Sequence, residues 1–252
     1  IMTTLLIIGG TGLVGSSIIR ETQKNIHLPS YHNTHILALS RTANAKKSVP
    51  GVSFVQGDAL DVASLKRSFE ANPNVVHTVG TLIEQRKYGD NGTYERMNRD
   101  AAINVAHTMA SKYDGINRRC FIYFSAGNAP PKYLLNERYI GAKREAERYL
   151  LGNKELNEKI RIVVLRPGLI YSYHRRQLML PLALGLIIGS AILKPLTSYV
   201  PSSARYFTDR PISDSEVSHA VFEILDDTEV EGICEIDKIR QLAKAWERKK
   251  SL

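Results

Sequence analysis

Short apolar runs rich in β-branched residues recur along the first two thirds of the chain, and stretches with helical spacing separate them. The runs lie at residues 5–8, 36–39, 52–55, 75–79, 120–124 and 160–165. The predicted helices between them lie at residues 13–24, 63–72, 94–112 and 139–151. Strands that alternate with helices form βαβ units, and such units build a parallel sheet covered by helices. The pattern therefore predicts an α/β fold.

The alternation ends after Tyr173. An apolar run at 178–193 leads into a segment with proline and serine at 195–201. We therefore predict a sheet domain over residues 1–172 and a small C-terminal lobe over residues 173–252, part of which packs back on the sheet. As a helix the apolar run would reach about 24 Å, short of the roughly 30 Å hydrocarbon core of a membrane. Three roles stay open for it: a buried helix, the wall of a site for a lipid-like substrate, or a docking surface for a membrane or a protein.

The first predicted strand runs directly into a turn with glycines at positions 9, 12 and 15, and a predicted helix follows. One glycine permits the positive φ of a tight turn, a second lets backbone N–H groups approach a pyrophosphate, and a third lets the helix pack closely on the sheet. The helix N-terminus adds partial positive charge. Between a first strand and a first helix, this spacing predicts a Rossmann-type, doubly wound sheet that binds a nicotinamide dinucleotide. The expected contacts in this turn are Gly9, Thr11, Gly12, Leu13, Val14 and Gly15.

The end of the second strand predicts which dinucleotide is bound. An NAD site usually places an acidic residue about 20 residues beyond the glycines, on the ribose 2′-hydroxyl. Here the strand is followed by Ser40, Arg41 and Thr42, without a carboxylate. A guanidinium forms a fork of donors that suits a 2′-phosphate. We therefore predict that NADP(H) is preferred over NAD(H); the alternative is that Arg41 is a solvated loop residue.

Later strand ends supply further expected cofactor contacts, which are Asp58, Ala59, Val79 and Gly80. Asp58 is placed where its carboxylate could accept from an adenine amino group, but it could equally cap the helix that begins near Ala63, as Asp61 could. Gly80 would permit a close backbone approach to the cofactor. His77, in the strand before it, is interpreted as a core histidine with satisfied hydrogen bonds.

Tyr139 and Lys143 are four residues apart and therefore share one face of a predicted helix. They follow Ser125, which ends the fifth strand, and precede Arg166-Pro-Gly168 after the sixth. In this order the motifs resemble those of the short-chain dehydrogenase/reductase superfamily, in its extended and atypical branches. The resemblance implies that Tyr139 is the general acid/base and that Lys143 lowers the pKa of the phenol and holds the nicotinamide ribose. It also implies that Pro167 and Gly168 line the nicotinamide end.

The position of the serine departs from the pattern of this superfamily. In many extended members the catalytic hydroxyl stands one residue further on, where this chain has Ala126. Ser125 is therefore the candidate catalytic hydroxyl, although neighbouring strand residues face opposite sides and its direction stays open. No metal site is predicted, because Cys120 and Cys234 lie far apart in apolar stretches typical of buried free thiols.

Three segments, at 76–82, 94–98 and 139–147, resemble a mitochondrial subgroup of the superfamily. That subgroup includes an NAD(P)H-binding accessory subunit of respiratory complex I and a fungal protein of coenzyme Q biosynthesis. The resemblance implies a peripheral protein on the matrix face of the mitochondrial inner membrane, with an inner-membrane complex as a partner. We expect an oxidoreductase linked to ubiquinone biosynthesis that transfers hydride to a quinone-like, lipid-like aromatic substrate. The alternative is a non-catalytic, nucleotide-binding accessory subunit of complex I.

Composition excludes other classes of protein. The chain has 43% hydrophobic and 23% charged residues, which excludes a disordered or collagen-like chain. Its 34 lysines and arginines exceed its 25 acidic residues by nine, but they are scattered, and the longest basic run is only at 248–250. A tail that binds nucleic acid needs about five or six like charges together, and no motif combines stacking aromatic and basic residues. We therefore expect no nucleic-acid partner.

Overall fold

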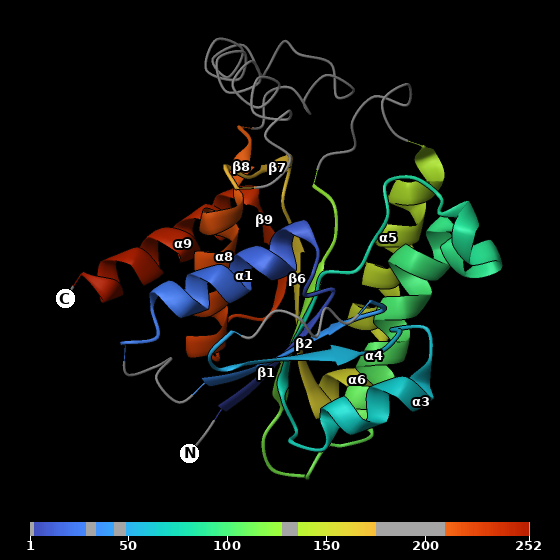
Figure 1. Ribbon diagram of the computed structural model, residues 1–252, viewed down its shortest axis with the longest axis horizontal. Helices are drawn as coiled ribbons and strands as arrows, with labels where there is room; N and C mark the ends of the chain where they lie inside the picture. The colour runs from blue at the N-terminus through green and yellow to red at the C-terminus, as the bar shows by residue number, and fades with distance from the viewer. Residues whose placement is uncertain (1–2, 29–33, 43–48, 128–135, 175–209, 252) are drawn as a thin grey trace.

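The computed structural model describes residues 3–28, 34–42, 49–127, 136–174 and 210–251. In this part of the chain a sheet lies between two groups of helices (Figure 1). Its strands are β1 (Thr3–Ile8), β2 (Thr34–Ser40), β3 (Val52–Gln56), β4 (Asn74–His77), β5 (Arg119–Phe124), β6 (Ile160–Arg166) and β9 (Gly232–Glu235). A separate small sheet pairs β7 (Ile170–Tyr171) with β8 (Ile212–Ser213).

Helices cover both faces of the main sheet. One face carries α1 (Leu13–Lys24), α8 (Asp214–Asp226) and α9 (Ile236–Lys250). The other carries α3 (Val62–Leu65), α4 (Ala101–Ala110), α5 (Glu137–Gly152) and α6 (Lys154–Lys159). Three shorter segments lie between these elements: η1 (Lys66–Phe69), η2 (Arg86–Gly92) and η3 (Arg96–Asp100).

The strand order is β3-β2-β1-β4-β5-β6-β9, and every neighbouring pair is parallel. Because β1 pairs with β2 on one side and with β4 on the other, the order reverses there. Ligands of open parallel sheets bind beyond the carboxyl ends of the strands at such a switch point. The Rossmann-type doubly wound sheet predicted from the sequence is confirmed.

Two apolar clusters hold the layers together. Along β1, Leu5 and Ile7 pack toward α1 and α8, whereas Leu6 and Ile8 pack toward the helices of the other face. A strand buried on both faces needs apolar residues at successive positions. This explains why the predicted strands read as continuous apolar runs.

The predicted elements differ from the structure in three places. The fourth strand ends at His77, two residues before its predicted end, and beyond it both the backbone N–H and the hydroxyl of Thr78 donate to the Ile8 carbonyl at 2.9 Å. The helix predicted at 63–72 is a short α-helix followed by the 3₁₀ segment η1. The helix predicted at 94–112 contains a π-helical turn, η3.

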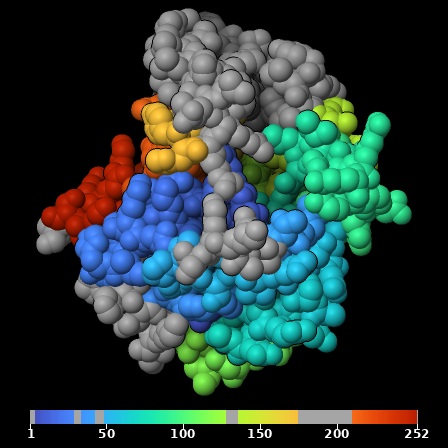
Figure 2. All heavy atoms as spheres, in the orientation of Figure 1, coloured from blue at the N-terminus to red at the C-terminus, as the bar shows by residue number. Residues whose placement is uncertain are grey.

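The C-terminal residues return to the sheet. Strand β9 pairs with β6, and α8 packs on both α1 and α9. In the space-filling view the red and orange C-terminal atoms lie directly against the blue N-terminal atoms (Figure 2). The apolar run at 178–193 lies outside the described residues, and the division at residue 172 stays a prediction. None of the helices in the described ranges has the length and hydrophobicity needed to cross a bilayer.

Candidate functional site

The glycine turn between β1 and α1 has no room for a side chain at Gly9 or Gly15. Gly9 has a φ of 91°, and a Cβ added there would lie 2.7 Å from the hydroxyl oxygen of Thr78. A Cβ on Gly15 would lie 2.5 Å from the Gly9 carbonyl oxygen. Gly12 is the N-cap of α1, whose first turn carries no acidic side chain. The turn therefore fits a bound pyrophosphate, because backbone N–H groups and the positive end of a helix dipole meet there without an opposing charge.

Two cavities meet beside this turn. One, of about 300 Å³, lies at the ends of β1, β2 and β3 and is lined by Arg41 and Asp58. The other, of about 280 Å³, lies at the ends of β4, β5 and β6 and is lined by Tyr139 and Lys143. Both cavities include Thr78 and Gly80 in their walls. They form one elongated crevice across the switch point of the sheet.

The structure brings almost all of the predicted site residues to this crevice. The first cavity is lined by Gly9, Thr11, Gly12, Ser40, Arg41, Asp58, Ala59, Val79 and Gly80. The second is lined by Leu13, Val14, Gly80, Ser125, Tyr139, Lys143, Pro167 and Gly168. The exception is Gly15, which packs beneath the turn and lines neither cavity.

The two acidic candidates after β3 have different positions. Asp61 is the N-cap of α3 and accepts from the backbone N–H of Ala63 at 3.0 Å. The carboxylate of Asp58 accepts from the backbone N–H of Leu60 at 2.9 Å and lines the first cavity. The capping role therefore belongs to Asp61, and Asp58 stays a candidate for adenine.

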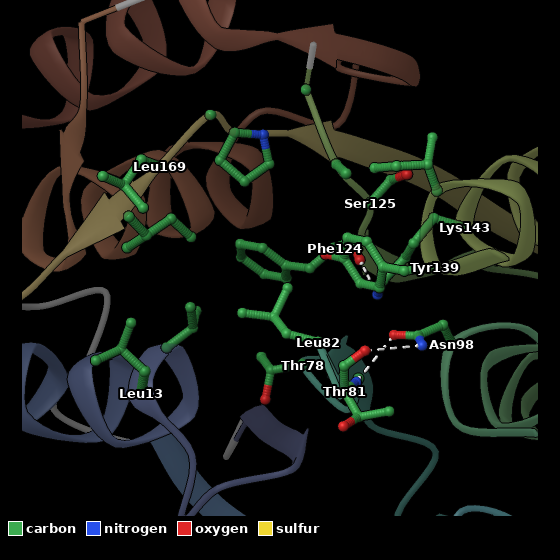
Figure 3. A pocket seen from close by; sticks show the side chains of 18 of the residues that line it. Leu13, Thr78, Thr81, Leu82, Asn98, Phe124, Ser125, Tyr139, Lys143 and Leu169 are labelled. Carbon is green, nitrogen blue, oxygen red and sulfur yellow. Dashed lines mark hydrogen bonds between the residues drawn. The ribbon is translucent and has the colours of Figure 1, made fainter. Parts of the chain in front are cut away.

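Lys143 lies at the floor of the second cavity. Its side chain is buried, its ammonium nitrogen donates to the Phe124 carbonyl at 2.7 Å, and it lies 4.9 Å from the centre of the Tyr123 ring. Burial lowers the pKa of Lys143 to about 7, although the charge of Glu147 opposes this shift. Figure 3 shows Tyr139, one helical turn earlier on α5, beside it at the cavity wall.

Asn98 is a site residue that the sequence did not reveal. It lies fully buried in η3, where its side-chain oxygen accepts from the Thr81 N–H at 3.0 Å and its amide donates to the Thr81 carbonyl at 3.1 Å (Figure 3). These bonds hold the loop after β4 against Lys143. A Cβ on Gly80 would lie 2.8 Å from the Asn98 side-chain oxygen and 3.0 Å from the Lys143 nitrogen. Single π-turns often occur at functional sites. The helical spacing of this segment did not predict one.

Ser125 lines the same cavity, directly after Phe124, whose carbonyl accepts from Lys143. Its hydroxyl is buried and makes no hydrogen bond of ordinary geometry within the described ranges. It lies close enough to Glu147 to contribute to the pKa of that carboxyl: burial raises this pKa, but Arg166, Ser125 and Arg144 together hold it below its usual value. The hydroxyl therefore lies near this carboxylate. Ala126, at the position usual for the catalytic hydroxyl, lines the same cavity.

His77 is a core histidine, as predicted, but it is not satisfied. It is fully buried at the end of β4, and neither ring nitrogen has a hydrogen-bond partner in the described part of the chain. Burial, with a smaller contribution from the charge of Lys143, lowers the pKa of His77 to about 3. The ring is therefore neutral, which excludes it as a cation at neutral pH.

The fold, the glycine turn and the Tyr139–Lys143 pair define a Rossmann-type protein with the motifs of a short-chain dehydrogenase. A family model supports this class. The chain belongs to the NAD-dependent epimerase/dehydratase family, whose model matches residues 5–185. The family resemblance inferred from the sequence motifs is thereby confirmed.

Individual relatives share a quarter or less of their residues with this chain. The chain is 25% identical to MIOREX complex component 2 of Saccharomyces cerevisiae in an alignment of 281 positions, which spans 93% of this chain and 98% of that protein. Among solved structures, UDP-glucose 4-epimerase of Thermus thermophilus with NAD matches at 17% identity and a TM-score of 0.63, over 99% of this chain and 84% of that one. WbmF of Bordetella bronchiseptica with NAD⁺ matches at 15% identity and a TM-score of 0.60, over 99% and 79%. At these identities the solved structures establish the fold.

Proposed function

We propose that the protein is an NADP(H)-dependent oxidoreductase that binds its dinucleotide in the crevice across the glycine turn. The observation that carries this proposal is the continuity of the crevice from Arg41, past the glycine turn and Gly80, to Tyr139 and Lys143. A dinucleotide needs an adenosine end, a pyrophosphate site and a nicotinamide end in that order. The family's name and the NAD in two matching structures support the same class of cofactor.

The preference for NADP(H) rests on Arg41. Its side chain lines the adenosine-end cavity, directly after β2, and no carboxylate stands at 40–42. A carboxylate there would hold a ribose 2′-hydroxyl and repel a 2′-phosphate, whereas a guanidinium attracts the phosphate.

The chemistry proposed is hydride transfer, which a bound nicotinamide supplies. Tyr139 moves the proton at the substrate oxygen, and the Lys143 ammonium favours the phenolate, because a nearby cation lowers the pKa of a phenol. Ser125 is included as a hydrogen-bond donor at the substrate end. Its buried hydroxyl lines the cavity without an ordinary partner in the described ranges, which supports this role.

The substrate proposed is a quinone-like, lipid-like aromatic molecule, in a step linked to coenzyme Q biosynthesis. The walls of the second cavity are largely apolar, with contributions from Leu13, Leu82, Phe124, Leu169 and Ile170 (Figure 3). Ligand sites of this kind bind apolar molecules with a few oriented polar groups. We also propose a mitochondrial location on the matrix face of the inner membrane. The sequence resemblance supports both, and the match to a MIOREX complex component along nearly the whole chain supports the mitochondrial location.

One observation favours a second candidate, a non-catalytic accessory subunit of respiratory complex I that binds the dinucleotide without turning it over. The chain has Ala126 where related enzymes place a hydroxyl, and the Ser125 hydroxyl lies near Glu147. A missing hydroxyl weakens catalysis without weakening the binding of the dinucleotide.

Tyr139→Phe tests the enzyme proposal. Turnover of NADPH with a short-chain ubiquinone analogue should fall by at least about 100-fold, since general acid–base catalysis contributes roughly 10²–10⁴. The affinity for NADPH should stay nearly unchanged, because the ring remains. Tyr149→Phe is the matched control: it lies on the same helix, and its hydroxyl contacts His107 at 2.7 Å on the surface, away from the crevice.

The outcomes separate the candidates. An unaltered rate in Tyr139→Phe would remove this residue from the mechanism. Wild-type protein that binds NADPH but never oxidises it, with any quinone offered, would favour the accessory subunit. Wild-type protein that binds neither dinucleotide would refute both.

A further inference from the structure

The side chain of Arg41 lies over an aromatic ring. Its guanidinium carbon is 3.7 Å from the centre of the Tyr88 ring, and both residues line the adenosine-end cavity. Tyr88 belongs to η2, which is distant in sequence from the end of β2. We propose that Tyr88 is a specificity-determining residue, which positions the Arg41 guanidinium for a 2′-phosphate. This inference rests on the proposed NADP(H) preference and deepens it.

Both sides of the stack are fixed by local hydrogen bonds. The backbone N–H of Tyr88 donates to the Gln85 carbonyl at 2.9 Å, and Gln85 in turn donates to the Gly92 carbonyl at 2.8 Å. On the other side, the Ser40 hydroxyl donates to the Thr42 carbonyl at 2.9 Å, which shapes the turn that carries Arg41. The contact is therefore made between two ordered turns.

The ring covers a face of the guanidinium and leaves its edge available. A guanidinium has five N–H donors in its plane, and stacking uses none of them. One donor reaches the sulfur of Met97 at 3.7 Å, which is a weak acceptor. Within the described ranges Arg41 forms no ion pair with a carboxylate. The remaining donors can therefore bind an anion at this cavity.

The charges around the stack also favour an anion. The ammonium of Lys87 lies 4.9 Å from the centre of the same ring, which brings a second cation to this position. Asp58 is the opposing charge in the cavity wall, and its carboxylate already accepts from the Leu60 N–H. Arg41 and Asp58 are the charged residues of the cavity wall, and Lys87, which lies outside that wall, adds a second cation near the stack.

Stacking strengthens binding because it reduces the freedom that Arg41 would lose on binding. Arginine has large rotamer entropy, and preorganisation improves affinity by lowering that loss. A cation–π contact at a partly exposed site corresponds to about a two- to fivefold change in an equilibrium constant. We therefore expect Tyr88 to raise the preference for the 2′-phosphate by about two- to fivefold, and Arg41 itself by at least tenfold.

The test measures binding of two small probes to the full chain by isothermal titration calorimetry. Adenosine 2′,5′-bisphosphate and adenosine 5′-monophosphate differ only in the 2′-phosphate, so the ratio of their affinities isolates its recognition. Tyr88→Phe should keep the wild-type ratio, because the ring remains. Tyr88→Ala and the bulkier Tyr88→Leu should both lower the ratio about two- to fivefold, and neither should lower it further when combined with Arg41→Ala.

The outcomes distinguish the proposed role of Tyr88 from the NADP(H) preference on which it rests. If Arg41→Ala leaves the ratio unchanged, the NADP(H) assignment is wrong and Tyr88 has nothing to position. If Arg41→Ala lowers the ratio but Tyr88→Ala and Tyr88→Leu keep the wild-type value, the assignment stands and the role of Tyr88 is refuted. A ratio lowered equally in Tyr88→Phe would attribute the effect to the hydroxyl, and would also overturn the stacking argument.

Discussion

Lys143, a proposed site residue, is a buried lysine, and burying its charge lowers the stability of the folded protein. Lys143 is 4% exposed, and burial lowers its pKa to about 7, against about 10.4 in an unfolded chain. Between these two values the unfolded chain holds a proton that the folded chain has released, so the free energy of unfolding rises with pH across this window. Below pH 7 both states hold the proton, and the buried charge lowers the free energy of unfolding by its full amount.

Lys143→Met should therefore change stability in a pH-dependent way. Relative to wild type, the variant should be most stable at pH 6, and its advantage should shrink steadily from about pH 7 to 10, because only the wild type gains stability in that window. Urea unfolding at pH 6, 8 and 10 measures the difference. The exposed Lys112→Met is the control and should differ from wild type by less than about 0.5 kcal/mol at every pH. A Lys143→Met difference that is constant with pH would contradict the burial argument.

The spacing of residues in the sequence predicted some residues of the candidate site but could not predict others. Tyr139 and Lys143 were accessible because four-residue spacing defines a helix face, and the glycine turn because each glycine has a steric reason. Asn98 and Tyr88 were not. Asn98 acts through a π-turn, which helical periodicity does not encode, and Tyr88 acts through a contact between two turns far apart in the chain.

Among the secondary-structure elements, α5 and β6 are joined through one buried carboxylate. Glu147, which is 2% exposed, accepts from Arg144 at 2.7 Å and from Arg166 at 3.1 Å. Arg144 also donates to the carbonyl of Gly127 at 3.0 Å, and Arg166 pairs with Glu235 on β9 at 2.6 Å. Helix α5, the loop after β5 and two strands are thus held in one ionic network behind the cavity.

Glu147→Gln should destabilise the protein by about 3 kcal/mol, since removing one partner of a buried pair leaves uncompensated charge. Glu145→Gln on the same helix is the control. Glu145 pairs with Arg99 at 2.6 Å but is 44% exposed, so its loss should cost less than about 1 kcal/mol. Because the pKa of Glu147 is lowered, its contribution is present above its unfolded pKa and is lost as the pH falls through the folded one. Urea midpoints for the two variants, at pH 7, make the comparison; equal losses would argue against a buried network.

Six of the seven strands of the main sheet were predictable because each carries an apolar run. Burial on both faces demands such a run of the interior strands. The edge strand β3, in which no residue is fully buried, keeps it at Val52, Phe54 and Val55. The seventh, β9, was not predicted as a strand. It is a four-residue edge strand in which Ile233 is 43% exposed and Cys234 is buried, so it lacks a continuous apolar signal. Its place is set by pairing with β6, a long-range contact that local patterning does not contain.

At the scale of the molecule, the C-terminal helices share a core with the N-terminal half. Ile18 of α1, Val217 of α8 and Trp246 of α9 belong to one apolar cluster. Polar contacts follow the same interface: Arg20 pairs with Asp214 at 3.0 Å. Removing either side would expose the apolar face of the other, so the described residues of both halves should unfold together.

Trp246 allows this cooperativity to be measured without any mutation. It is the one tryptophan in the sequence, it is 2% exposed, and it stacks on His219 with ring centres 4.4 Å apart. Its fluorescence therefore reports the α8–α9 layer, while far-UV circular dichroism reports all helices. The two signals should give coincident urea transitions, as two-state unfolding requires. NADPH at about 100 times its Kd should stabilise both by about 2.7 kcal/mol, because the crevice and this layer share one core. A fluorescence transition at lower urea that NADPH does not shift would instead establish a separate C-terminal lobe.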